Sequence, residues 1–229
     1  MNNEIIIFGS AEIAEIAKFY FHHDSPFKVV AFTVDDEFVR EESLQGVPII
    51  AFSEISRNFP SDKYRAHVAL SYKNLNKLRE EKYFQMKKKG YELISYISSS
   101  NKIWNKDKIG DNCLILENQT IQPSVTIGNN VMIWSGNHIG HGTNIGDHNY
   151  ISSHVVFSGN CNIGKRNFFG VNSTIKDFCL IEDDCFVTMG SLISKDMKSG
   201  SVSIAKSHTE ILTSDNRKAK TIKKLYFGN

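Results

Sequence analysis

The stretch NHIGHGTNIGDHNYISSHVVFSG, residues 137–159, places a large apolar side chain at every sixth position. The same spacing runs without a break from Ile103 to Ile193, at sixteen positions of which thirteen are isoleucine. An α-helix repeats every 3.6 residues and a strand every two, so neither produces this period. A repeat of six over about 90 residues instead predicts a solenoid, in which short strands and turns stack and bury one continuous core.

The other places of the hexad fit the same interpretation. A small side chain usually stands two places before the apolar residue, where a narrow prism has little room, and glycine often follows it. All four cysteines occupy the small place, and none has the CxxC spacing of a zinc site. We therefore interpret Cys113, Cys161, Cys179 and Cys185 as structural residues rather than metal ligands or a catalytic thiol.

This repeat resembles that of the hexapeptide acyltransferase superfamily. The resemblance implies a left-handed parallel β-helix with a triangular cross-section and three hexads to a coil. The handedness follows from the resemblance alone, because parallel crossovers are otherwise right-handed. The resemblance also implies a homotrimer with active sites in the grooves between subunits. We assign residues 99–205 to this β-helix and 206–229 to a C-terminal tail, in which DNRKAKTIKKLYF predicts a short basic helix.

Residues 1–98 alternate strand patterns with helix patterns, which predicts a small parallel sheet with helices. Four strands are expected, near 4–8, 27–36, 47–52 and 67–72, with helices after Gly9 and within 74–90, the latter closed by Gly90. An α/β domain followed by a hexapeptide β-helix resembles the bacterial nucleotide-sugar acyltransferases, the group that includes the sialic acid O-acetyltransferases. The resemblance implies transfer of an acetyl or similar group from acyl-CoA to a nucleotide-linked sugar, in the synthesis of surface glycans.

Charge and hydropathy exclude several kinds of partner and location for this protein. The net charge is +2, and residues 1–60 carry ten acids against four bases. An acidic excess over a whole domain argues against a nucleic-acid partner. No apolar run reaches the length of a membrane span and no signal peptide is visible, so we expect no membrane span and a cytoplasmic location. A dinucleotide fingerprint is absent, which argues against NAD.

Four of the eight histidines lie within seventeen residues, at positions His138, His141, His148 and His154. His141 stands two places after an apolar residue, in a turn from which a side chain can point outward. One coil later stands Gly159, which leaves room beside the imidazole and exposes a backbone N–H. Acyl transfer needs a base near the attacking atom and a donor near the thioester carbonyl. The resemblance implies the same pair, with His141 as general base and the Gly159 amide on the acyl-CoA carbonyl.

The sequence departs from this group at two positions. The family often has an acidic residue directly after the histidine and a second histidine nine residues on, where this chain has Gly142 and Tyr150. Asn137, Asp147 and Tyr150 are the candidates to orient the imidazole, and Asn137 and Tyr150 also count as candidate substrate contacts. We expect His138 to contact or orient the substrate, His154 to line the acyl-CoA groove, and His148 to be a surface turn residue.

Ligands of parallel α/β sheets bind at the carboxyl ends of the strands. Gly9 and Ser10 precede a helix whose first N–H groups suit a phosphate. Asp35 and Asp36 are candidates to bind the base or ribose, and Tyr72 follows the fourth strand. The resemblance adds Asn76 and Arg79, since the family places Asn and Arg at the start of the next helix. Helix capping and surface charge explain these last two residues equally well.

The end of the β-helix also departs from the family, which usually closes with a glycine-asparagine-proline-alanine turn near the pantetheine arm. This chain has Ser203-Ile204-Ala205-Lys206 instead, and Lys206 is a candidate acyl-CoA contact. The basic residues of the tail either meet the CoA phosphates across a trimer or form a solvated face, namely Arg217, Lys218, Lys220, Lys223 and Lys224.

Three alternatives remain beside transfer to an amine of a nucleotide-linked amino sugar. Transfer to a hydroxyl keeps the same chemistry, and we favour the amine because it is the better nucleophile for a base without an acidic neighbour. Zinc carbonic anhydrases also use left-handed β-helices, but the histidine gaps of three, seven and six do not match their ligand spacing, so no metal is expected. A trimeric scaffold that senses a nucleotide sugar without catalysis is the third.

Overall fold

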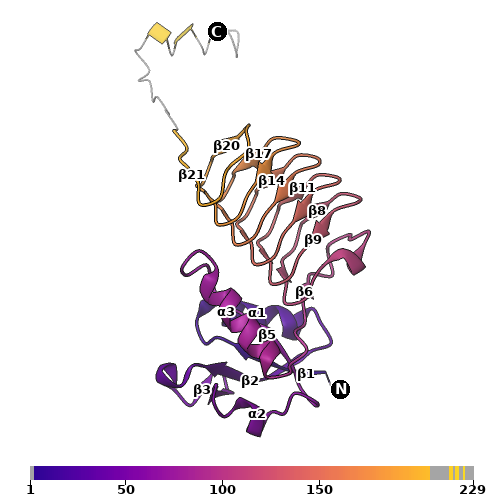
Figure 1. Cartoon of the computed structure of the whole chain (residues 1–229), viewed down its shortest axis with the longest axis vertical. Helices are drawn as coiled ribbons and strands as arrows, with labels where there is room; N and C mark the ends of the chain where they lie inside the picture. Colours follow the sequence, from indigo (N-terminus) through magenta and orange to yellow (C-terminus); the bar gives the residue numbers. More distant parts are fainter. Residues whose placement is uncertain (1–2, 207–216, 219, 222–223, 225–229) are drawn as a thin grey trace.

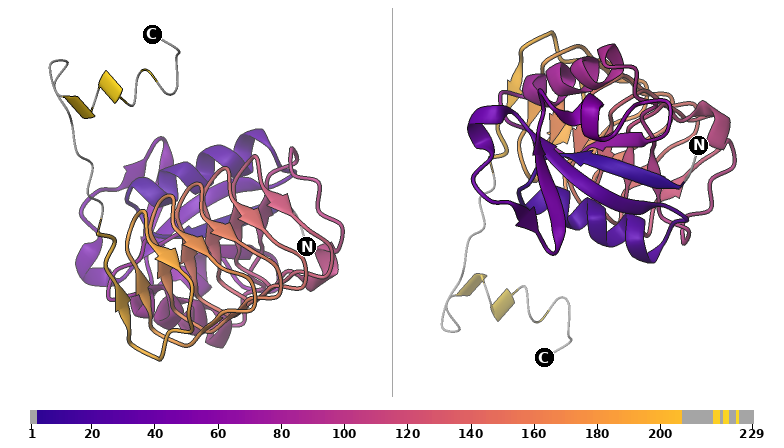
Figure 2. Two further views of the ribbon diagram at one scale, coloured as in Figure 1. Left: turned by 90° about the horizontal axis from the view of Figure 1, so that it is seen from above. Right: turned by 90° about the horizontal axis from the view of Figure 1, so that it is seen from below.

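The structure is a computed structural model that describes residues 3–206, 217–218, 220–221 and 224. An N-terminal α/β unit lies against one side of a stack of coils, which lies above it in Figure 1. Figure 2 shows the same arrangement from above and from below. The coils form a left-handed parallel β-helix, so the predicted fold class is confirmed. In the C-terminal tail, residues 217–218, 220–221 and 224 have helical backbone, and the rest of the predicted helix lies outside the described residues.

The N-terminal sheet has five strands in the order β3-β4-β2-β1-β5. Strands β4, β2, β1 and β5 are parallel, and β3 runs antiparallel to β4. The four parallel strands correspond to the four predicted ones, but β2 ends two residues before its predicted end and β5 ends four residues before its predicted end. β3 was not predicted because it is only two residues long. The strands are β1 Glu4–Phe8, β2 Lys28–Val34, β3 Ser43–Leu44, β4 Val47–Ala51 and β5 Arg65–Val68.

Two long helices flank this sheet, α1 at Glu12–His23 and α3 at Lys77–Lys88, with a short α2 at Ile55–Asn58. Two 3₁₀ turns, Asp36–Phe38 and Lys106–Lys108, complete the helical elements of the described residues. Gly90 closes α3 as predicted, with a positive φ of 87°. Its N–H donates to Lys87 and the next N–H donates to Met86, which is the Schellman pattern that only a left-handed residue permits.

The β-helix consists of two-residue strands that form three parallel sheets. Between residues 96 and 193 each strand pairs with the strand eighteen residues away, as between Ile133 and Ile151, so three hexads make one coil. The first sheet holds β6 Tyr96–Ile97, β7 Leu114–Ile115, β10 Met132–Ile133, β13 Tyr150–Ile151, β16 Phe168–Phe169, β19 Phe186–Val187 and β21 Val202–Ser203. The second holds β8 Thr120–Ile121, β11 His138–Ile139, β14 Val156–Phe157, β17 Thr174–Ile175 and β20 Leu192–Ile193. The third holds β9 Thr126–Ile127, β12 Asn144–Ile145, β15 Asn162–Ile163 and β18 Leu180–Ile181. The last pair, β19 with β21, is sixteen residues apart, because Val187 pairs with Ser203.

The second residue of each strand points into the prism and forms its core. From Ile115 to Ile193 every member of the predicted hexad series is buried, and the cysteines fill the corners between them. All four cysteines are free thiols. Burial raises the pKa of the Cys113 thiol to about 12, so this sulfur stays protonated and inert at neutral pH. The structural interpretation of the cysteines is therefore consistent with their surroundings.

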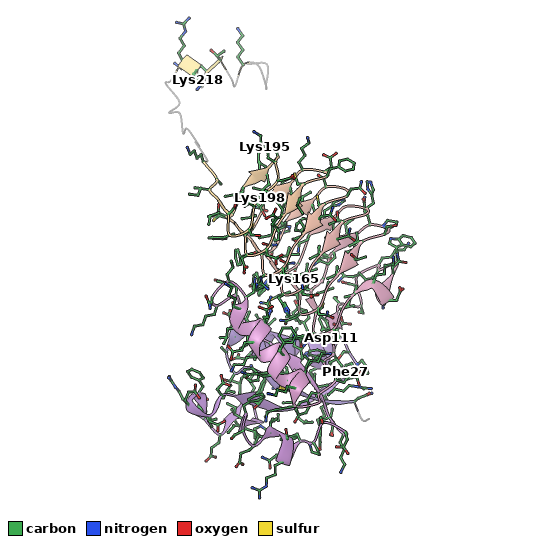
Figure 3. The ribbon with its side chains drawn as sticks, viewed as in Figure 1. Phe27, Asp111, Lys165, Lys195, Lys198 and Lys218 are labelled. Carbon is green, nitrogen blue, oxygen red and sulfur yellow. The ribbon has the colours of Figure 1, made fainter. Side chains whose placement is uncertain are left out.

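The first sheet of the β-helix is also the wall that packs on the N-terminal unit. Its outward side chains Leu114, Met132 and Tyr150 share one apolar cluster with residues of β1 and α1. Asp111, labelled in Figure 3, lies at the edge of this junction. Its carboxylate accepts a hydrogen bond from Tyr83 of α3 at 2.7 Å. β6 already belongs to this sheet, so the first coil begins two residues before the boundary predicted at residue 98.

Candidate active site

His141 lies in the turn that follows β11, at the corner between the second and third sheets of the β-helix. Its side chain is exposed, and the imidazole ring covers the backbone of Gly159 in the next coil. A Cβ atom added to Gly159 would lie 2.7 Å from Cε1 and 2.9 Å from Nε2 of the ring. The structure thus brings His141 and Gly159 together as the eighteen-residue coil predicts, and it shows that the ring needs a glycine at this place.

Gly159→Ala is therefore expected to displace the imidazole with little effect on the fold. The new methyl group cannot share space with a ring edge 2.7 Å away, and a shift of about 1 Å at a reacting group costs on the order of 100-fold in rate. Steady-state kinetics with the substrates proposed below, together with the melting temperature, provide the measurement. Ser158→Ala is the control, because it changes the adjacent side chain without adding an atom beside the ring; equal losses in the two variants would contradict the expectation.

Gln122, in the preceding coil, is the side chain that contacts the imidazole. Its Oε1 accepts a hydrogen bond from the backbone N–H of His141 at 2.8 Å and lies 3.1 Å from Nδ1 of the ring. The sequence analysis did not identify this residue. The sequence did contain a sign of its importance. Gln122 directly follows the apolar Ile121, at a hexad place that holds a glycine, Gly140, one coil later.

The three residues predicted to orient His141 have other contacts. Asn137 is buried in a corner of the prism, where its Oδ1 accepts from the N–H of Val155 at 2.7 Å. Asp147 accepts from the N–H of Asn129 at 2.8 Å, in a different corner. Tyr150 lies on the outer face of the first sheet and accepts from the indole N–H of Trp134 at 2.6 Å. These contacts correct the prediction, since the side chains stabilise the coils and their junction instead of orienting the base.

The remaining histidines lie in three different settings. His138 is half-buried on the outer face of the second sheet, directly before the turn of His141. His154 is exposed at another corner, between β13 and β14, where its ring covers Gly136 of the preceding coil. No contact between His154 and His141 is present. Their predicted roles toward substrate and acyl-CoA remain predictions.

His148 was expected on the surface, and this expectation is wrong. Its side chain is buried under α3, with Nδ1 2.8 Å from Nδ2 of Asn130 and Nε2 3.4 Å from a carboxylate oxygen of Glu80. Burial lowers the pKa of His148 to about 4, against the opposing effect of Glu80, so the ring is neutral at physiological pH. The residue does occupy a turn, with φ of 62°, but α3 covers that corner of the prism.

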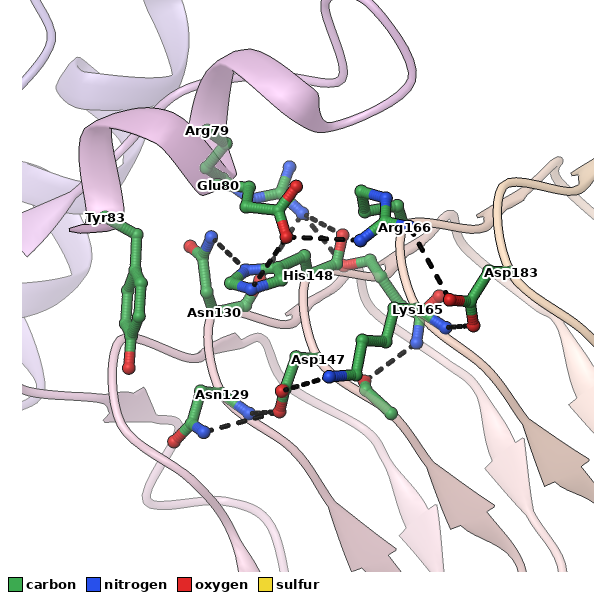
Figure 4. A network of polar contacts seen from close by, with 12 residues as sticks. Arg79, Glu80, Tyr83, Asn129, Asn130, Asp147, His148, Lys165, Arg166 and Asp183 are labelled. Carbon is green, nitrogen blue, oxygen red and sulfur yellow. Dashed lines mark hydrogen bonds and ion pairs between the residues drawn. The ribbon is translucent and has the colours of Figure 1, made fainter. Parts of the chain in front are cut away.

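Asn76 and Arg79 join the same junction, shown in part in Figure 4. Asn76 is fully buried, and its Nδ2 donates to the carbonyl oxygen of Asn167 in the β-helix at 3.0 Å. The Arg79 guanidinium donates to the carbonyl oxygens of His148 at 2.9 Å and Asn149 at 3.0 Å, and also to Oδ1 of Asn76. Both side chains are sealed from solvent, which corrects the prediction that they bind substrate: they fasten α3 to the coils.

The loop before α3 is held in a strained form by these contacts. Asn74, Leu75 and Asn76 all have positive φ, at 51°, 48° and 66°. A left-handed residue other than glycine costs about 1–2 kcal/mol, so three in a row persist only where the surroundings fix them. The hydrogen bonds of Asn76 to Arg79 and to the β-helix provide that fixation, and the loop borders the hollow described next.

A hollow of about 820 Å³ opens at the carboxyl ends of β1 and β2. Of the predicted contacts, Gly9, Ser10 and Asp35 line it. Gly9 has φ of 128°, and a Cβ there would lie 2.6 Å from the carbonyl oxygen of Ala69, so only glycine fits this turn. Asp36 lies outside the lining and accepts from the N–H of Ser53 at 3.0 Å. Tyr72 also lies outside, packed edge-on against Tyr150.

The hollow mixes charges of both signs. Its basic side chains are Arg40, Lys73, Lys77 and Lys82, and its acidic ones are Asp35, Glu37 and Glu81. Lys82 is almost fully buried and pairs with Asp35 at 2.8 Å, so one carboxylate oxygen of Asp35 is already neutralised. The first N–H groups of α1 border the hollow and have no side-chain cap, although Glu12 and Glu15 in the first turn weaken their attraction for an anion.

Lys206 lies far along the chain from these sites, at the last coil. It borders a second hollow of about 410 Å³ with residues of β20 and Ile204. Whether Lys206 meets acyl-CoA remains a prediction. Of the basic tail residues, Lys223 lies outside the described residues, and the other four have helical backbone.

Within the described ranges, no group of three or more His, Cys, Asp or Glu side chains is arranged to hold a metal ion. No helix found in the same residues is both long and apolar enough to cross a membrane.

Comparisons with known proteins were made for the sequence and the fold. No curated protein sequence matches the chain. The family described as bacterial transferase hexapeptide (six repeats) matches residues 108–140 and 124–159. Thirty-eight chains of solved structures match.

Three of these solved structures cover most of the chain. The acetyltransferase domain of PglB from Neisseria gonorrhoeae, in complex with acetyl coenzyme A, has a TM-score of 0.76 at 15% identity over 88% of this chain and 96% of that one. A histidine-to-asparagine variant of perosamine N-acetyltransferase from Caulobacter crescentus, in complex with CoA and GDP-perosamine, has a TM-score of 0.76 at 19% identity over 88% and 91%. WeeI from Acinetobacter baumannii has a TM-score of 0.52 at 18% identity over 86% and 94%. Residues 108–159 of this chain thus match the bacterial transferase hexapeptide family, and the chain shares its fold with these solved structures.

Proposed function

We propose that this protein transfers an acetyl group from acetyl-CoA to the amino group of a nucleotide-linked amino sugar. The observation that carries the proposal is the exposed imidazole of His141 against the bare backbone of Gly159. That pair offers a proton acceptor and a backbone N–H donor side by side, which is what attack on a thioester carbonyl requires. The similar folds that bind acetyl coenzyme A, or CoA with GDP-perosamine, support the same chemistry.

In the proposed reaction the sugar nitrogen attacks the thioester carbonyl carbon. His141 accepts the proton that the nitrogen loses, and the Gly159 N–H stabilises the negative charge on the carbonyl oxygen. The C–N bond forms, the C–S bond breaks, and the leaving thiolate takes the proton back from the imidazolium. No covalent enzyme intermediate is needed, because the thioester is already activated; the remaining acceleration comes from holding both substrates together.

The hollow of the N-terminal unit is the proposed site for the nucleotide. Gly9 and Ser10 would face a phosphate together with Lys73 and Lys77, and Asp35 would accept a hydrogen bond from the base or ribose. The N-terminal unit packs on the first sheet of the prism, whereas His141 lies at the corner between the other two. One chain thus presents its hollow and its imidazole on opposite sides, which favours a homotrimer in which the nucleotide of one subunit faces His141 of the next.

A panel of nucleotide-linked sugars tests the proposal. The protein is incubated with acetyl-CoA and either amino sugars or sugars that carry only hydroxyl groups, and acetylated products are identified by mass spectrometry. We expect acetylation of an amine. Acetylation of hydroxyl sugars alone would replace the proposal by its O-transferase alternative, and failure to bind any acyl-CoA in calorimetry would favour the non-catalytic scaffold.

A further inference from the structure

The contact between Gln122 and His141 determines more than the position of the ring. Oε1 of Gln122 faces two groups at once, the backbone N–H of His141 at 2.8 Å and Nδ1 of its ring at 3.1 Å. A backbone N–H can only donate a hydrogen bond, so the amide atom that faces it must be the oxygen and not the nitrogen. The orientation of the Gln122 amide is therefore fixed by the main chain rather than by the ring.

The tautomer of His141 follows from this orientation. An amide oxygen carries no hydrogen, so it can only accept from Nδ1, and Nδ1 must hold the proton of the neutral ring. Nε2 is then left with a free lone pair. The ring edge formed by Nδ1, Cε1 and Nε2 lies over Gly159, with Nε2 at 2.9 Å and Nδ1 at 3.2 Å from the place where a Cβ would be. Because Nδ1 is engaged by Gln122, Nε2 is the ring nitrogen that remains free beside this backbone.

We infer that Gln122 is the positioning residue of the base, which selects the Nδ1–H tautomer of His141 and leaves Nε2 to accept the proton. The inference rests on the proposed function for its kinetic consequences, but the tautomer itself is a property of the folded protein. Gln122 contacts the ring from the preceding coil, and the residue directly after His141 is Gly142, which has no side chain to offer.

A neutral partner changes the chemistry that the imidazole can perform. A carboxylate at this place would stabilise the imidazolium that forms during transfer, whereas an amide oxygen adds no charge. No ionisable side chain has a described contact with the ring. The charged residues of the same corner lie in coils that do not contain the ring's direct neighbours. They are Lys176 and Asp177 one coil beyond Gly159, Lys195 and Asp196 one coil further, and Lys106, Asp107 and Lys108 one coil before Gln122, while His138 stands on the adjoining sheet.

An imidazole that is paired with an amide oxygen instead of a carboxylate suits an amine acceptor. After the C–N bond has formed, the nitrogen is positively charged and gives up its proton readily. A hydroxyl must lose its proton while the C–O bond is forming, which demands a stronger base. The contact between Gln122 and His141 in this chain thus supports the proposal that the acceptor is an amine.

Two variants of Gln122 test the inference. Gln122→Leu keeps the approximate volume and removes the acceptor, and Gln122→Glu keeps an acceptor and adds a charge. The tautomer is read by ¹⁵N NMR of the histidine-labelled protein, with the His141 signals assigned by their loss in His141→Asn. In the native protein we expect the Nδ1–H form. In Gln122→Leu we expect a mixture with the Nε2–H form and a fall in kcat of about 10–100-fold, as for other residues that orient a functional histidine.

Gln122→Glu is expected to retain the Nδ1–H tautomer and to move the acid limb of the kcat/KM profile by about one pH unit, toward higher pH. It should also raise the rate with hydroxyl acceptors relative to amines. Thr120→Val, on the neighbouring strand, is the control for local disturbance and should change neither the NMR spectrum of His141 nor the profile. An unchanged tautomer and unchanged kinetics in Gln122→Leu would overturn the inference. The NMR measurement does not depend on enzymatic activity. If the native protein transferred no acetyl group, the proposed function would be refuted, whereas the tautomer assignment would still be decided by the ¹⁵N spectra.

Discussion

His141→Asn is expected to lower kcat by about 10²–10⁴-fold, the usual contribution of a general base, while the protein remains folded. Asparagine preserves a polar side chain of moderate size in an exposed turn but cannot accept a proton near neutral pH. Because the ring lies at the surface of the prism and outside its core, the coils should be unaffected. Acetyl transfer is measured with the amino sugar identified from the panel, and folding is monitored by circular dichroism and melting temperature.

The affinity for the nucleotide sugar should change much less than kcat. The proposed nucleotide site is built by the N-terminal unit and contains no atom of His141. His22→Asn, at an exposed position of α1, is the matched control and should retain full turnover. Full activity in a folded His141→Asn protein would remove His141 as the base and with it the proposed mechanism.

The second large effect is expected from Arg79→Met, which should lower the free energy of unfolding by about 3 kcal/mol. The guanidinium is buried and donates to carbonyl oxygens in two segments of the β-helix and to Asn76. Methionine fills much of the space but removes the donor to the carbonyl oxygen of His148 and to Oδ1 of Asn76, whereas the Asn149 oxygen keeps the N–H of Met132. Each unsatisfied buried group costs about 1–3 kcal/mol. Urea unfolding followed by fluorescence and by circular dichroism provides the measurement.

Arg65→Met is the matched control for the loss of an arginine. Arg65 pairs with Glu92, whose side chain is half exposed, and such pairs contribute about 1 kcal/mol or less. We also expect Arg79→Met to weaken nucleotide binding, because Arg79 holds Asn76 and thereby the strained loop beside the hollow. Equal destabilisation by the two arginine variants would show that the buried contacts of Arg79 contribute no more to the free energy of unfolding than the exposed pair of Arg65 does.

The hexad period predicted the β-helix correctly because each apolar residue of the series can be buried only in the interior of a narrow prism. A shift of one residue would expose every isoleucine from Ile115 onward, so the pattern leaves no alternative register. The same coil length predicted that His141 and Gly159 would meet. In the N-terminal unit, alternation of strand and helix patterns located the four parallel strands, and Gly90 predicted the end of α3.

The errors concern contacts between elements that are distant in the chain. His148 occupies a turn like many surface residues, and only the packing of α3 on that corner buries it. Asn76 and Arg79 matched a family pattern, but the pattern could not show that their partners are main-chain oxygens of the coils. Gln122 was missed because its place beside His141 depends on the path of a side chain across two coils, which residue spacing alone does not describe.

The pairing distance of eighteen residues, constant from β6 to β20, restricts where this protein can change its length. Inserting a whole coil beyond Gly159 would lengthen the prism and leave His141 on its glycine, since both would keep their places. Inserting a single hexad between them would turn every later residue onto the next wall and set a different side chain opposite the imidazole. The segment from His141 to Gly159 must therefore keep its length, because any insertion within it separates the imidazole from the glycine amide.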